Sequence, residues 1–435
     1  MKKKLLKRKL FKKLTKWINR KEILAIKGPR QAGKTTLLKM LIKWLKNEKK
    51  VNQNKIIFIT LEDREVLKKI EQNALEFVKS FIGKNKKDTF YFLIDEFHYL
   101  ENGGQILKLL YDNFDNVKFI ITGSSSLELT NKTAKFLVGR VFFLNLWPFD
   151  FEEALQLESK QLNNIYQKRS KQVKEFIETS KKFSSPKKDI FIKDFKKVFE
   201  KYSIWGGYPE VLKTEDEETK KTILKNIYNT YIKKDIIEIL KTTDHSTLED
   251  LISLLAIQTG NLIKYNSLTN TIDSYFKEVK QYLSILEETF ILNRINPYHK
   301  NKTKEIKKTP KIYFVDNGLR NYIINNFNPP SLRTDKGSLI ENTVFSQFKK
   351  NNDKIKIKYW RTKSEAEVDF ILEKQQKLIP VEVKYSNFKA PNIPPSFKRF
   401  IEKYNPNKGI ILTKGFWGKT NFKSTLVRFI PVWYI

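Results

Sequence analysis

The sequence predicts an α/β protein, and three observations support this fold class. An apolar run at 23–26 leads through a glycine-containing loop into a helical run at 36–42, which gives a strand, a loop and a helix in succession. Two further runs of mainly apolar residues, at 90–94 and 117–121, are typical of buried parallel strands. Between residues 337 and 430, short strands and helices follow one another again. We therefore expect a parallel sheet in the N-terminal part and a second α/β domain at the C-terminal end.

The loop between the first strand and the first helix carries a specific pattern. Residues 28–35, Gly-Pro-Arg-Gln-Ala-Gly-Lys-Thr, fill the G-x-x-x-x-G-K-S/T pattern of a phosphate-binding loop. In such a loop the backbone N–H groups bind phosphate, Lys34 reaches the β- and γ-phosphates, and the Thr35 hydroxyl ligates Mg²⁺. A chance Gly-Lys turn is the alternative, which the flanking strand and helix disfavour. The sequence thus predicts a site for ATP and Mg²⁺, and the residues expected to bind the nucleotide are Gly28, Pro29, Arg30, Gln31, Ala32, Gly33, Lys34, Thr35 and Thr36.

The strand at 90–94 ends in two acidic residues, Asp95 and Glu96. Its carboxyl end should lie beside the phosphate loop, because ligands bind at this edge of open α/β sheets. Asp95 is then expected to hold Mg²⁺ through water, and Glu96 to orient the water that attacks ATP. The alternative is that this pair only caps a helix. After the next strand, either Thr122 or Ser124 is a candidate sensor of the γ-phosphate.

Six short motifs follow one another along the chain. They are Gly-Pro-Arg-Gln-Ala-Gly-Lys-Thr-Thr-Leu-Leu at 28–38, Ile-Asp-Glu-Phe-His at 94–98, Gly-Ser-Ser-Ser-Leu-Glu-Leu at 123–129, Val-Gly-Arg at 138–140, Pro-Phe-Asp-Phe-Glu-Glu at 148–153 and Trp-Gly-Gly-Tyr-Pro-Glu at 205–210. In this order they resemble the AAA-type ATPases of archaea and bacteria that carry a C-terminal domain of poorly defined function. The resemblance covers nearly the whole chain and implies a P-loop core, a helical lid, a winged helix and a restriction-endonuclease-like end.

Two positions in these motifs need separate comment. His98 stands where the family commonly has Gln, so the resemblance assigns it no role. Arg140 matches the family's Gly-Arg, and it is a candidate to act on the γ-phosphate, either in cis or from a neighbouring subunit of a homo-oligomer. The alternative for Arg140 is a structural salt bridge.

A second group of charged residues lies in the C-terminal part. Asp369 is expected on one strand, and Glu382 and Lys384 on the next, where a spacing of two puts both on one face. Glu341 would approach from a helix. Carboxylates that converge beside a lysine can hold Mg²⁺, here through Glu341, Asp369 and Glu382, and can activate water. The pattern resembles the PD-(D/E)xK nucleases, with Asp369, Glu382 and Lys384 as the matching catalytic residues. The same fold also serves as an inactive scaffold.

We expect four domains along the chain. These are an ATPase core at 1–147, a helical lid or insertion at 148–245, a winged-helix-like segment at 246–300 and a nuclease-like domain at 301–435. The winged helix rests on three successive helical runs followed by a strand, an order that suits either DNA reading or protein contact.

The composition limits the classes of partner and compartment. Lys plus Arg number 84 and Asp plus Glu 48, so the net charge is +36, which favours a nucleic-acid partner, DNA in particular. A lysine bias from an A/T-rich coding sequence is the alternative explanation. Cysteine is absent, which excludes disulfides and thiolate zinc sites. No apolar stretch of about 18 residues occurs, so we expect no membrane span and a cytoplasmic location.

Two hypotheses for the function follow. In the first, the protein is an ATPase that acts on nucleic acid, with an optional Mg²⁺-dependent nuclease at the C-terminal end. In the second, it is a nucleotide switch of the signalling type, in which the nuclease-like domain is an inactive module that binds protein or DNA. A working ATP site is common to both.

Overall fold

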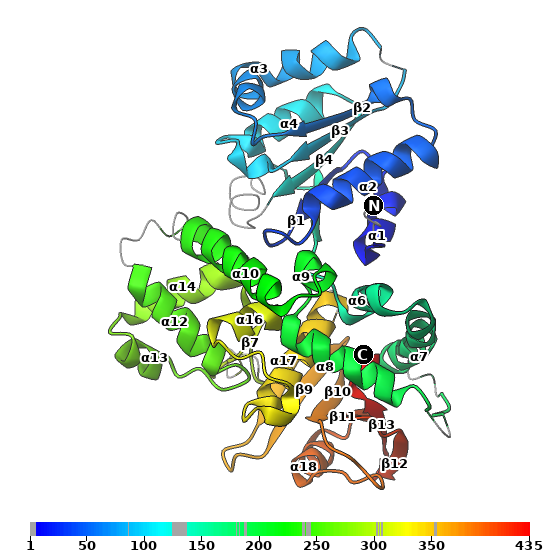
Figure 1. Ribbon diagram of the computed structural model, residues 1–435, viewed down its shortest axis with the longest axis vertical. Coiled ribbons are helices and arrows are strands. Elements are labelled where there is room, and N and C mark those ends of the chain that lie inside the picture. Colours follow the sequence, from blue (N-terminus) through cyan, green and yellow to red (C-terminus); the bar gives the residue numbers. More distant parts are fainter. Residues whose placement is uncertain are drawn as a thin grey trace. The chain divides into compact units, whose positions relative to one another are not determined.

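A computed structural model gives the structure of the protein (Figure 1) and describes residues 6–85, 87–123, 137–179, 181, 183–186, 189–236, 240, 245–301, 303, 305, 308–351 and 355–435. The chain forms two compact units. The first unit is Met1–Pro148 with Glu288–Phe290, and the second is Phe149–Glu287 with Ile291–Ile435. The expected division of the second unit at residues 245 and 300 stays a prediction.

The first unit alternates strands and helices. Its described elements are α1 (Lys9–Trp17), β1 (Ile23–Lys27), α2 (Lys34–Asn47), η1 (Gln53–Lys55), β2 (Ile56–Thr60), α3 (Arg64–Ile82), β3 (Phe90–Asp95), η2 (Phe97–Tyr99), α4 (Gly103–Asn113), β4 (Val117–Gly123) and β5 (Val141–Asn145).

The strands of the first unit form one parallel sheet with helices on both faces. Its order is β2-β3-β4-β1-β5, and each pair of neighbours is parallel. Alternate strand residues point to opposite faces. Ala25 and Phe119 pack on one face with apolar residues of α3 and α4, and Leu24 and Ile120 pack on the other with α1 and α2. The predicted α/β fold with a P-loop type of parallel sheet is therefore confirmed.

The second unit begins with helices and ends with a sheet. Its described elements are α6 (Phe151–Glu158), α7 (Lys160–Thr179), α8 (Ile192–Trp205), α9 (Pro209–Lys213), α10 (Glu217–Ile227), the π-helix η3 (Tyr228–Ile236), α12 (His245–Ile257), α13 (Tyr265–Thr271), α14 (Phe276–Glu288), β6 (Leu292–Ile295), β7 (Lys311–Phe314), α16 (Asn317–Ile323), η4 (Pro330–Leu332), α17 (Lys336–Asn351), β8 (Lys356–Arg361), β9 (Glu367–Lys374), β10 (Lys377–Lys384), α18 (Pro395–Tyr404), β11 (Lys408–Thr413), β12 (Gly418–Phe422), β13 (Thr425–Pro431) and η5 (Val432–Tyr434).

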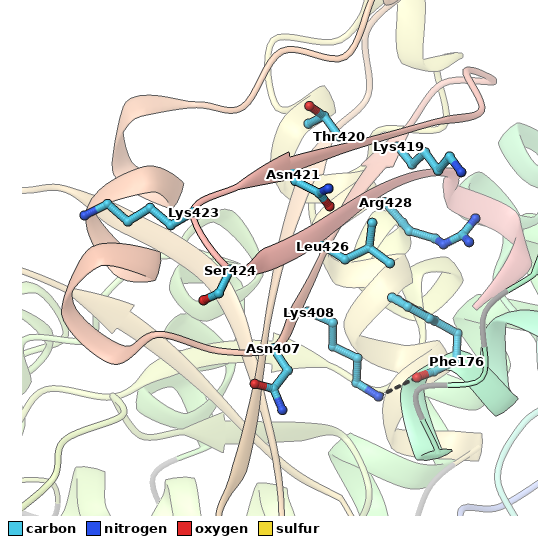
Figure 2. Close-up of a pocket in the computed structure, with 10 residues that line it drawn as sticks. All are labelled: Phe176, Asn407, Lys408, Lys419, Thr420, Asn421, Lys423, Ser424, Leu426 and Arg428. Carbon is cyan, nitrogen blue, oxygen red and sulfur yellow. Dashed lines mark hydrogen bonds between the residues drawn. The ribbon is translucent and has the colours of Figure 1, made fainter.

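The described strands β8 to β13 form a mixed sheet in the order β12-β13-β11-β10-β9-β8. The inner strands β10, β11 and β13 are parallel, and the outer pairs are antiparallel. One face packs on apolar residues of α7, α8 and α17, and the other face packs on α18. At the start of β11, Lys408 donates a hydrogen bond to the carbonyl of Phe176 in α7 (Figure 2).

The helical part of the second unit includes the segment in which a winged helix is expected. Before it, α10 gives way at residue 228 to a π-helix. The expected helices before Leu292 are present as α12, α13 and α14, and β6 pairs antiparallel with β7. A helix triplet followed by a two-stranded sheet matches the predicted order, while the winged-helix assignment stays a prediction.

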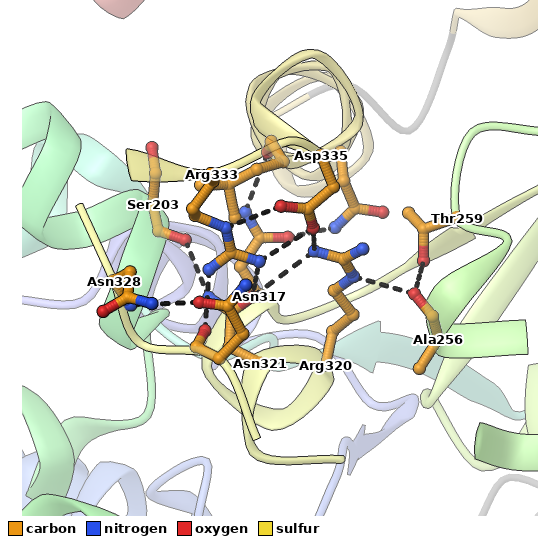
Figure 3. A network of polar contacts seen from close by, with 12 residues as sticks. Ser203, Ala256, Thr259, Asn317, Arg320, Asn321, Asn328, Arg333 and Asp335 are labelled. Carbon is orange, nitrogen blue, oxygen red and sulfur yellow. Dashed lines mark hydrogen bonds and ion pairs between the residues drawn. The ribbon is translucent and has the colours of Figure 1, made fainter. Parts of the chain in front are cut away.

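A buried polar network fixes the start of α17 (Figure 3). The carboxylate of Asp335 lies between two guanidinium groups, 2.6 Å from Nη1 of Arg320 and 2.7 Å from Nε of Arg333. Burial raises the pKa of Asp335, but the hydrogen bonds and charges of the two arginines outweigh it and hold the pKa at about 2. Arg320 also donates to the carbonyl of Ala256 in α12. These contacts join α12, α16 and α17, and α17 carries Glu341.

Candidate functional site

The loop between β1 and α2 has a backbone that requires its glycines. Gly33 adopts φ 96° and ψ 31°, a left-handed conformation that favours glycine. A Cβ atom at Gly28 would lie 2.1 Å from the carbonyl oxygen of Leu146, so no larger residue fits there. Lys34 is 4% exposed, and its Nζ donates to the carbonyls of Gly28 at 3.2 Å and Pro29 at 3.3 Å. The ammonium group is thus held inside the loop at the N-terminus of α2, where anions bind.

The residue that fastens this loop was not predicted from the sequence. Arg8 is buried, and it donates from Nη1 to the carbonyl of Ala32 at 2.8 Å and from Nη2 to that of Trp147 at 2.6 Å. Because one contact spans 24 positions and the other 139, local sequence gives no signal for it. Among the other expected nucleotide contacts, Gln31 and Thr36 are exposed in the structure.

The acidic residues after β3 meet the loop, although β4 lies between β1 and β3. The hydroxyl of Thr35 donates to Oδ2 of Asp95 at 2.5 Å. Thr122, at the end of β4, donates to Oδ1 of Asp95 and accepts from the backbone N–H of Glu96 at 3.1 Å. Thr122 therefore links both acidic residues. The other sensor candidate, Ser124, lies outside the described residues.

Glu96 has a backbone conformation and two neighbours that set its side chain. Its φ is 53°, in the left-handed region that is uncommon for a residue with a side chain. Its carboxylate lies 3.9 Å from Nζ of Lys34 and 3.2 Å from Nδ1 of His98. Burial raises the pKa of Glu96. The hydrogen bond with His98 and the charges of Lys34 and Arg30 lower it by more than burial raises it, so the net shift is downward. The carboxylate form is thereby favoured next to the loop.

The oxygen atoms at this edge fit Mg²⁺. A hydroxyl and a carboxylate, from Thr35 and Asp95, lie in direct contact with each other beside the phosphate loop. Mg²⁺ prefers such hard oxygen ligands and usually completes its shell with water and substrate phosphates.

Arg140 lies away from this edge of the sheet. Its carbonyl accepts a hydrogen bond from the N–H of Ile23, at the start of β1, while the loop follows the end of β1, about 13 Å further on. The guanidinium forms an ion pair with Asp112 at 3.0 Å and lies over the ring of Tyr111. These contacts support the alternative of a structural salt bridge, and an action of Arg140 on the γ-phosphate stays a prediction.

The charged residues of the second unit also come together. Lys384 and Glu382, on β10, form an ion pair of 2.9 Å, and Glu382 is 2% exposed. Asp369, on β9, accepts from the backbone N–H of Val383 at 2.7 Å. Burial raises the pKa of Asp369, and the charges of Glu382 and Glu341 raise it further. Burial also raises the pKa of Glu382, against the lowering effect of Lys384.

Two residues of this cluster were missed by the sequence analysis. The Nζ atom of Lys311, on β7, lies 2.5 Å from Glu367 and 3.4 Å from Glu341, and the ammonium is almost fully buried. The hydroxyl of Tyr313 donates to Glu341 at 2.5 Å. Both residues lie on β7, a short strand outside the nuclease-like motif of Asp369, Glu382 and Lys384. A fixed cation thus lies among the carboxylates.

The predicted Mg²⁺ ligands Glu341, Asp369 and Glu382 of the second unit stay a prediction. Across the described ranges, no three carboxylate or imidazole side chains are arranged to hold a metal ion. The physical reason is that Glu341 is engaged by Tyr313 and Lys311, and Glu382 by Lys384. The expected metal ligands Glu341, Asp369 and Glu382 are thus near one another but serve ion pairs and a backbone contact.

Three family models match the chain. Residues 20–155 match a model described as an AAA domain. Residues 196–330 and 336–434 match models described as Domain of unknown function (DUF8612) and Domain of unknown function (DUF4143). The nuclease-like and winged-helix assignments therefore stay predictions.

The relatives that align with most of this chain, and the similar solved structures, have low sequence identity to it. An uncharacterized protein of Haemophilus influenzae is 24% identical, over 95% of this chain and 94% of its own. One of Methanocaldococcus jannaschii is also 24% identical, over 82% and 73%. Among solved structures, the Aeropyrum pernix ORC2 protein (ADP form) has a TM-score of 0.32 at 12% identity, over 78% of this chain and 92% of that one. Domain III of the Thermotoga maritima replication initiation protein DnaA has a TM-score of 0.26 at 19% identity, over 42% and 89%. Scores this low bear on neither fold nor function.

The family match at 20–155 coincides with the loop, the sheet edge and the acidic residues described above. In the described residues no helix is long and apolar enough to cross a membrane. The N-terminal part of this chain is an AAA-type P-loop domain of the nucleotide-binding ATPase class.

Proposed function

We propose that the protein binds ATP with Mg²⁺ at the phosphate loop and hydrolyses it. One observation carries the proposal: side chains from three strand ends converge at a single edge of the sheet. Lys34 and Thr35 begin α2 after β1, Asp95 ends β3 and Glu96 follows it, and Thr122 lies one residue before the end of β4. A buried lysine, a hydroxyl and two carboxylates beside a phosphate loop are the parts that phosphoryl transfer to water needs.

Each side chain has its own task in the proposed reaction. The Lys34 ammonium balances charge on the β- and γ-phosphates, and Thr35 and Asp95 hold Mg²⁺, which when bound neutralises developing phosphate charge. Glu96 orients the attacking water and takes up its proton, for which it must be ionised. Thr122 acts as a positioning residue, because it fixes the carboxylate of one acid and the backbone of the next.

Replacing Glu96 separates hydrolysis from binding. We expect Glu96→Gln to lower steady-state ATP hydrolysis by about 100-fold or more, the usual effect of losing a general base. Binding of a fluorescent ATP analogue should be retained, since Lys34 and the loop are intact. Glu101→Gln, at an exposed position nearby, is the matched control and should behave as wild type. Equal turnover by Glu96→Gln and the control would contradict the assigned role.

For the second unit we propose nucleic-acid binding under the control of the ATP site, with DNA as the preferred partner. The net charge of the whole chain, +36, supports a polyanionic partner. The paired state of the C-terminal carboxylates supports binding over cleavage, since Glu341 and Glu382 are each engaged by a lysine. This combines the nucleotide-switch hypothesis with a nucleic-acid ligand.

The binding proposal is tested by fluorescence anisotropy. Labelled duplex DNA, single-stranded DNA and RNA of one sequence are titrated with the protein, with and without ATP, at several salt concentrations. We expect DNA affinity that falls as salt rises and that responds to ATP in wild type but not in Lys34→Ala. Absence of binding to all three at low salt would contradict the proposal.

Metal-dependent cleavage is the alternative for the second unit, and the ion pairs of Glu341 and Glu382 with lysines argue against it. We therefore expect labelled DNA to stay intact during incubation with the protein and Mg²⁺. The control is Glu402→Gln, at an exposed position. Cleavage that is lost in Glu382→Gln and retained in this control would show that the second unit is a nuclease and does more than bind nucleic acid.

A further inference from the structure

A pocket of about 730 Å³ opens at the edge of the C-terminal sheet, away from the carboxylate cluster (Figure 2). Strands β11, β12 and β13 and the ring of Phe176 form its walls. The volume falls in the usual range for small-molecule sites, about 300 to 1,000 Å³. No acidic residue is among the described residues that line it.

The strand register places cations on one face of this sheet edge. Arg428 on β13 pairs directly with Lys419 on β12. Lys408 pairs with Leu426, which is two positions from Arg428 and therefore on the same face. Like charges directly opposite each other on neighbouring strands are destabilising by themselves. A bound anion would reduce the repulsion among these three cations.

Arg428 is the most informative residue of the pocket. It is 3% exposed and donates from Nη2 to the carbonyl of Phe183. Its guanidinium lies 4.0 Å from the ring centroid of Phe183 and 5.4 Å from that of Phe176. Within the described residues, Nε and Nη1 are enclosed without a hydrogen-bond partner, and no carboxylate pairs with the group. Burial lowers the pKa of Arg428. Enclosed donors without a partner are rare and often mark the place of a water or an ion.

Lys408 adds a second buried ammonium group to the floor. It is 7% exposed, and Nζ donates to the carbonyls of Phe176 and Ile177 near the end of α7. Burial and the charges of Lys377 and Lys374 lower the pKa of Lys408 to about 8. An anion in the pocket would reverse this effect, because it would favour the charged form.

The rim of the pocket is polar and exposed. Lys419 and Asn421 belong to it, and Lys423 belongs to it while also pairing with Glu402 at 3.6 Å. Buried guanidinium and ammonium groups at the floor, with an exposed ammonium and an amide above them, match a dianionic phosphate, whose oxygens accept several hydrogen bonds at once.

We propose that this pocket binds a small molecule that carries a phosphate group, held by Arg428 and Lys408 at the floor and by Lys419 at the rim. The site is separate from the phosphate loop and goes beyond the proposed ATP hydrolysis. Its ligand is a phosphomonoester, either a nucleotide or a non-nucleotide ester, and the volume of the pocket fits such a molecule better than an extended nucleic-acid strand.

Calorimetric titration of the full chain tests the proposal. The Lys34→Ala protein is used, so that binding at the phosphate loop is suppressed and a failure here is distinct from a failure of the ATP hydrolysis proposal. The probes are AMP, ribose 5-phosphate, inorganic phosphate and adenosine. We expect AMP and ribose 5-phosphate to bind, inorganic phosphate to bind no more tightly than these two, and adenosine not to bind. AMP binding more tightly than ribose 5-phosphate would identify a nucleotide site, and equal binding would identify the phosphate ester as the recognised part.

Variants locate the binding. Adding Arg428→Gln or Lys408→Met should weaken AMP or ribose 5-phosphate binding at least tenfold, and Lys419→Ala should weaken it several-fold. Lys419 is exposed, so its replacement tests the site even where a buried variant fails to fold. Lys389→Ala, at an exposed position outside the pocket, is the control. No binding of any phosphate probe at millimolar concentration, or equal binding by Lys419→Ala and Lys389→Ala, would overturn the proposal. Binding of a 12-nucleotide strand that needs Arg428, without binding of the small probes, would overturn it in favour of nucleic acid.

Discussion

The hydroxyl of Thr35 donates a hydrogen bond to the carboxylate of Asp95, 2.5 Å away and 60 positions distant in the sequence. This contact joins the phosphate loop after β1 to the end of β3, although the two strands are not neighbours in the sheet. The strand between them, β4, supplies Thr122, which holds the other oxygen of the same carboxylate. The proposed Mg²⁺ ligands are therefore fixed in place by the fold itself.

Gly28→Ala should disrupt the phosphate loop. An added Cβ atom would lie 2.1 Å from the carbonyl oxygen of Leu146, a backbone atom that cannot move aside cheaply. We expect a loss of about 1 to 3 kcal/mol in the free energy of unfolding, measured by urea denaturation, together with weaker ATP binding. Gly337→Ala is the control, because a Cβ atom there meets nothing within 4 Å. A Gly28→Ala protein as stable as that control would show that the loop has more room than the structure gives it.

Arg140→Ala separates a structural role from a catalytic one. The ion pair with Asp112 is partly exposed, and such pairs contribute only about 0 to 1 kcal/mol. We expect a small loss of stability and an unchanged ATP turnover at protein concentrations where the chain is monomeric. A large loss of turnover that appears only as the concentration rises would instead show that Arg140 acts on a neighbouring subunit in a homo-oligomer.

Asp335→Asn should lower stability in a manner that depends on pH. The pKa of Asp335 is about 2 in the folded protein against an ordinary value of 3.8, so the carboxylate contributes stability above pH 3.8 and loses it as the pH falls toward 2. The expected difference from wild type at pH 6 is about 1 to 2 kcal/mol, after allowance for solvent screening, and it should shrink at pH 2 to 3. Urea denaturation at both pH values measures this. Asp250→Asn, at an exposed position, should show no such trend, and a difference independent of pH would contradict the assigned role of the two arginines.

Lys311→Met should destabilise the second unit. The buried ammonium pairs with Glu341 and Glu367, so its removal takes the lysine charge from two partly buried carboxylates. Removing one member of a buried ion pair typically costs about 3 to 5 kcal/mol. Thermal unfolding monitored by circular dichroism provides the measurement, with the exposed Lys308→Met as control. If both variants unfold at the same temperature, Lys311 does not compensate the carboxylate cluster.

The elements that carry the proposed ATP site follow from local sequence. The strand, the glycine loop and the helix after it lie next to one another in the chain, and the pattern at 28–35 predicts which residues face phosphate. Apolar runs likewise predicted β1, β3 and β4, because strands buried on both faces need them. Strands β2, β5 and β12 were not predicted, and the last of these alternates intermediate and exposed residues at a sheet edge.

The parts that depend on distant contacts could not be predicted. Arg8 reaches Ala32 and Trp147, and Lys311 reaches Glu341 from a strand that no motif marks. A motif states which residue types are present, whereas the ion pairs that neutralise them depend on how strands from elsewhere pack. For that reason the carboxylates of the second unit and Lys384 matched a nuclease pattern, while the second lysine partner, Lys311, became visible only in the folded chain.

The most direct test of the account is ATP hydrolysis by Lys34→Ala, with Lys39→Ala on the exposed face of the same helix as control. Phosphate release is measured with saturating ATP and Mg²⁺, and folding of each variant is checked by circular dichroism. We expect hydrolysis by wild type and by Lys39→Ala, and a loss of about 100-fold or more in Lys34→Ala, because the buried ammonium group can no longer balance the phosphate charge. Equal rates in the two folded variants, or no hydrolysis by wild type, would contradict the assignment of the phosphate loop as the catalytic site.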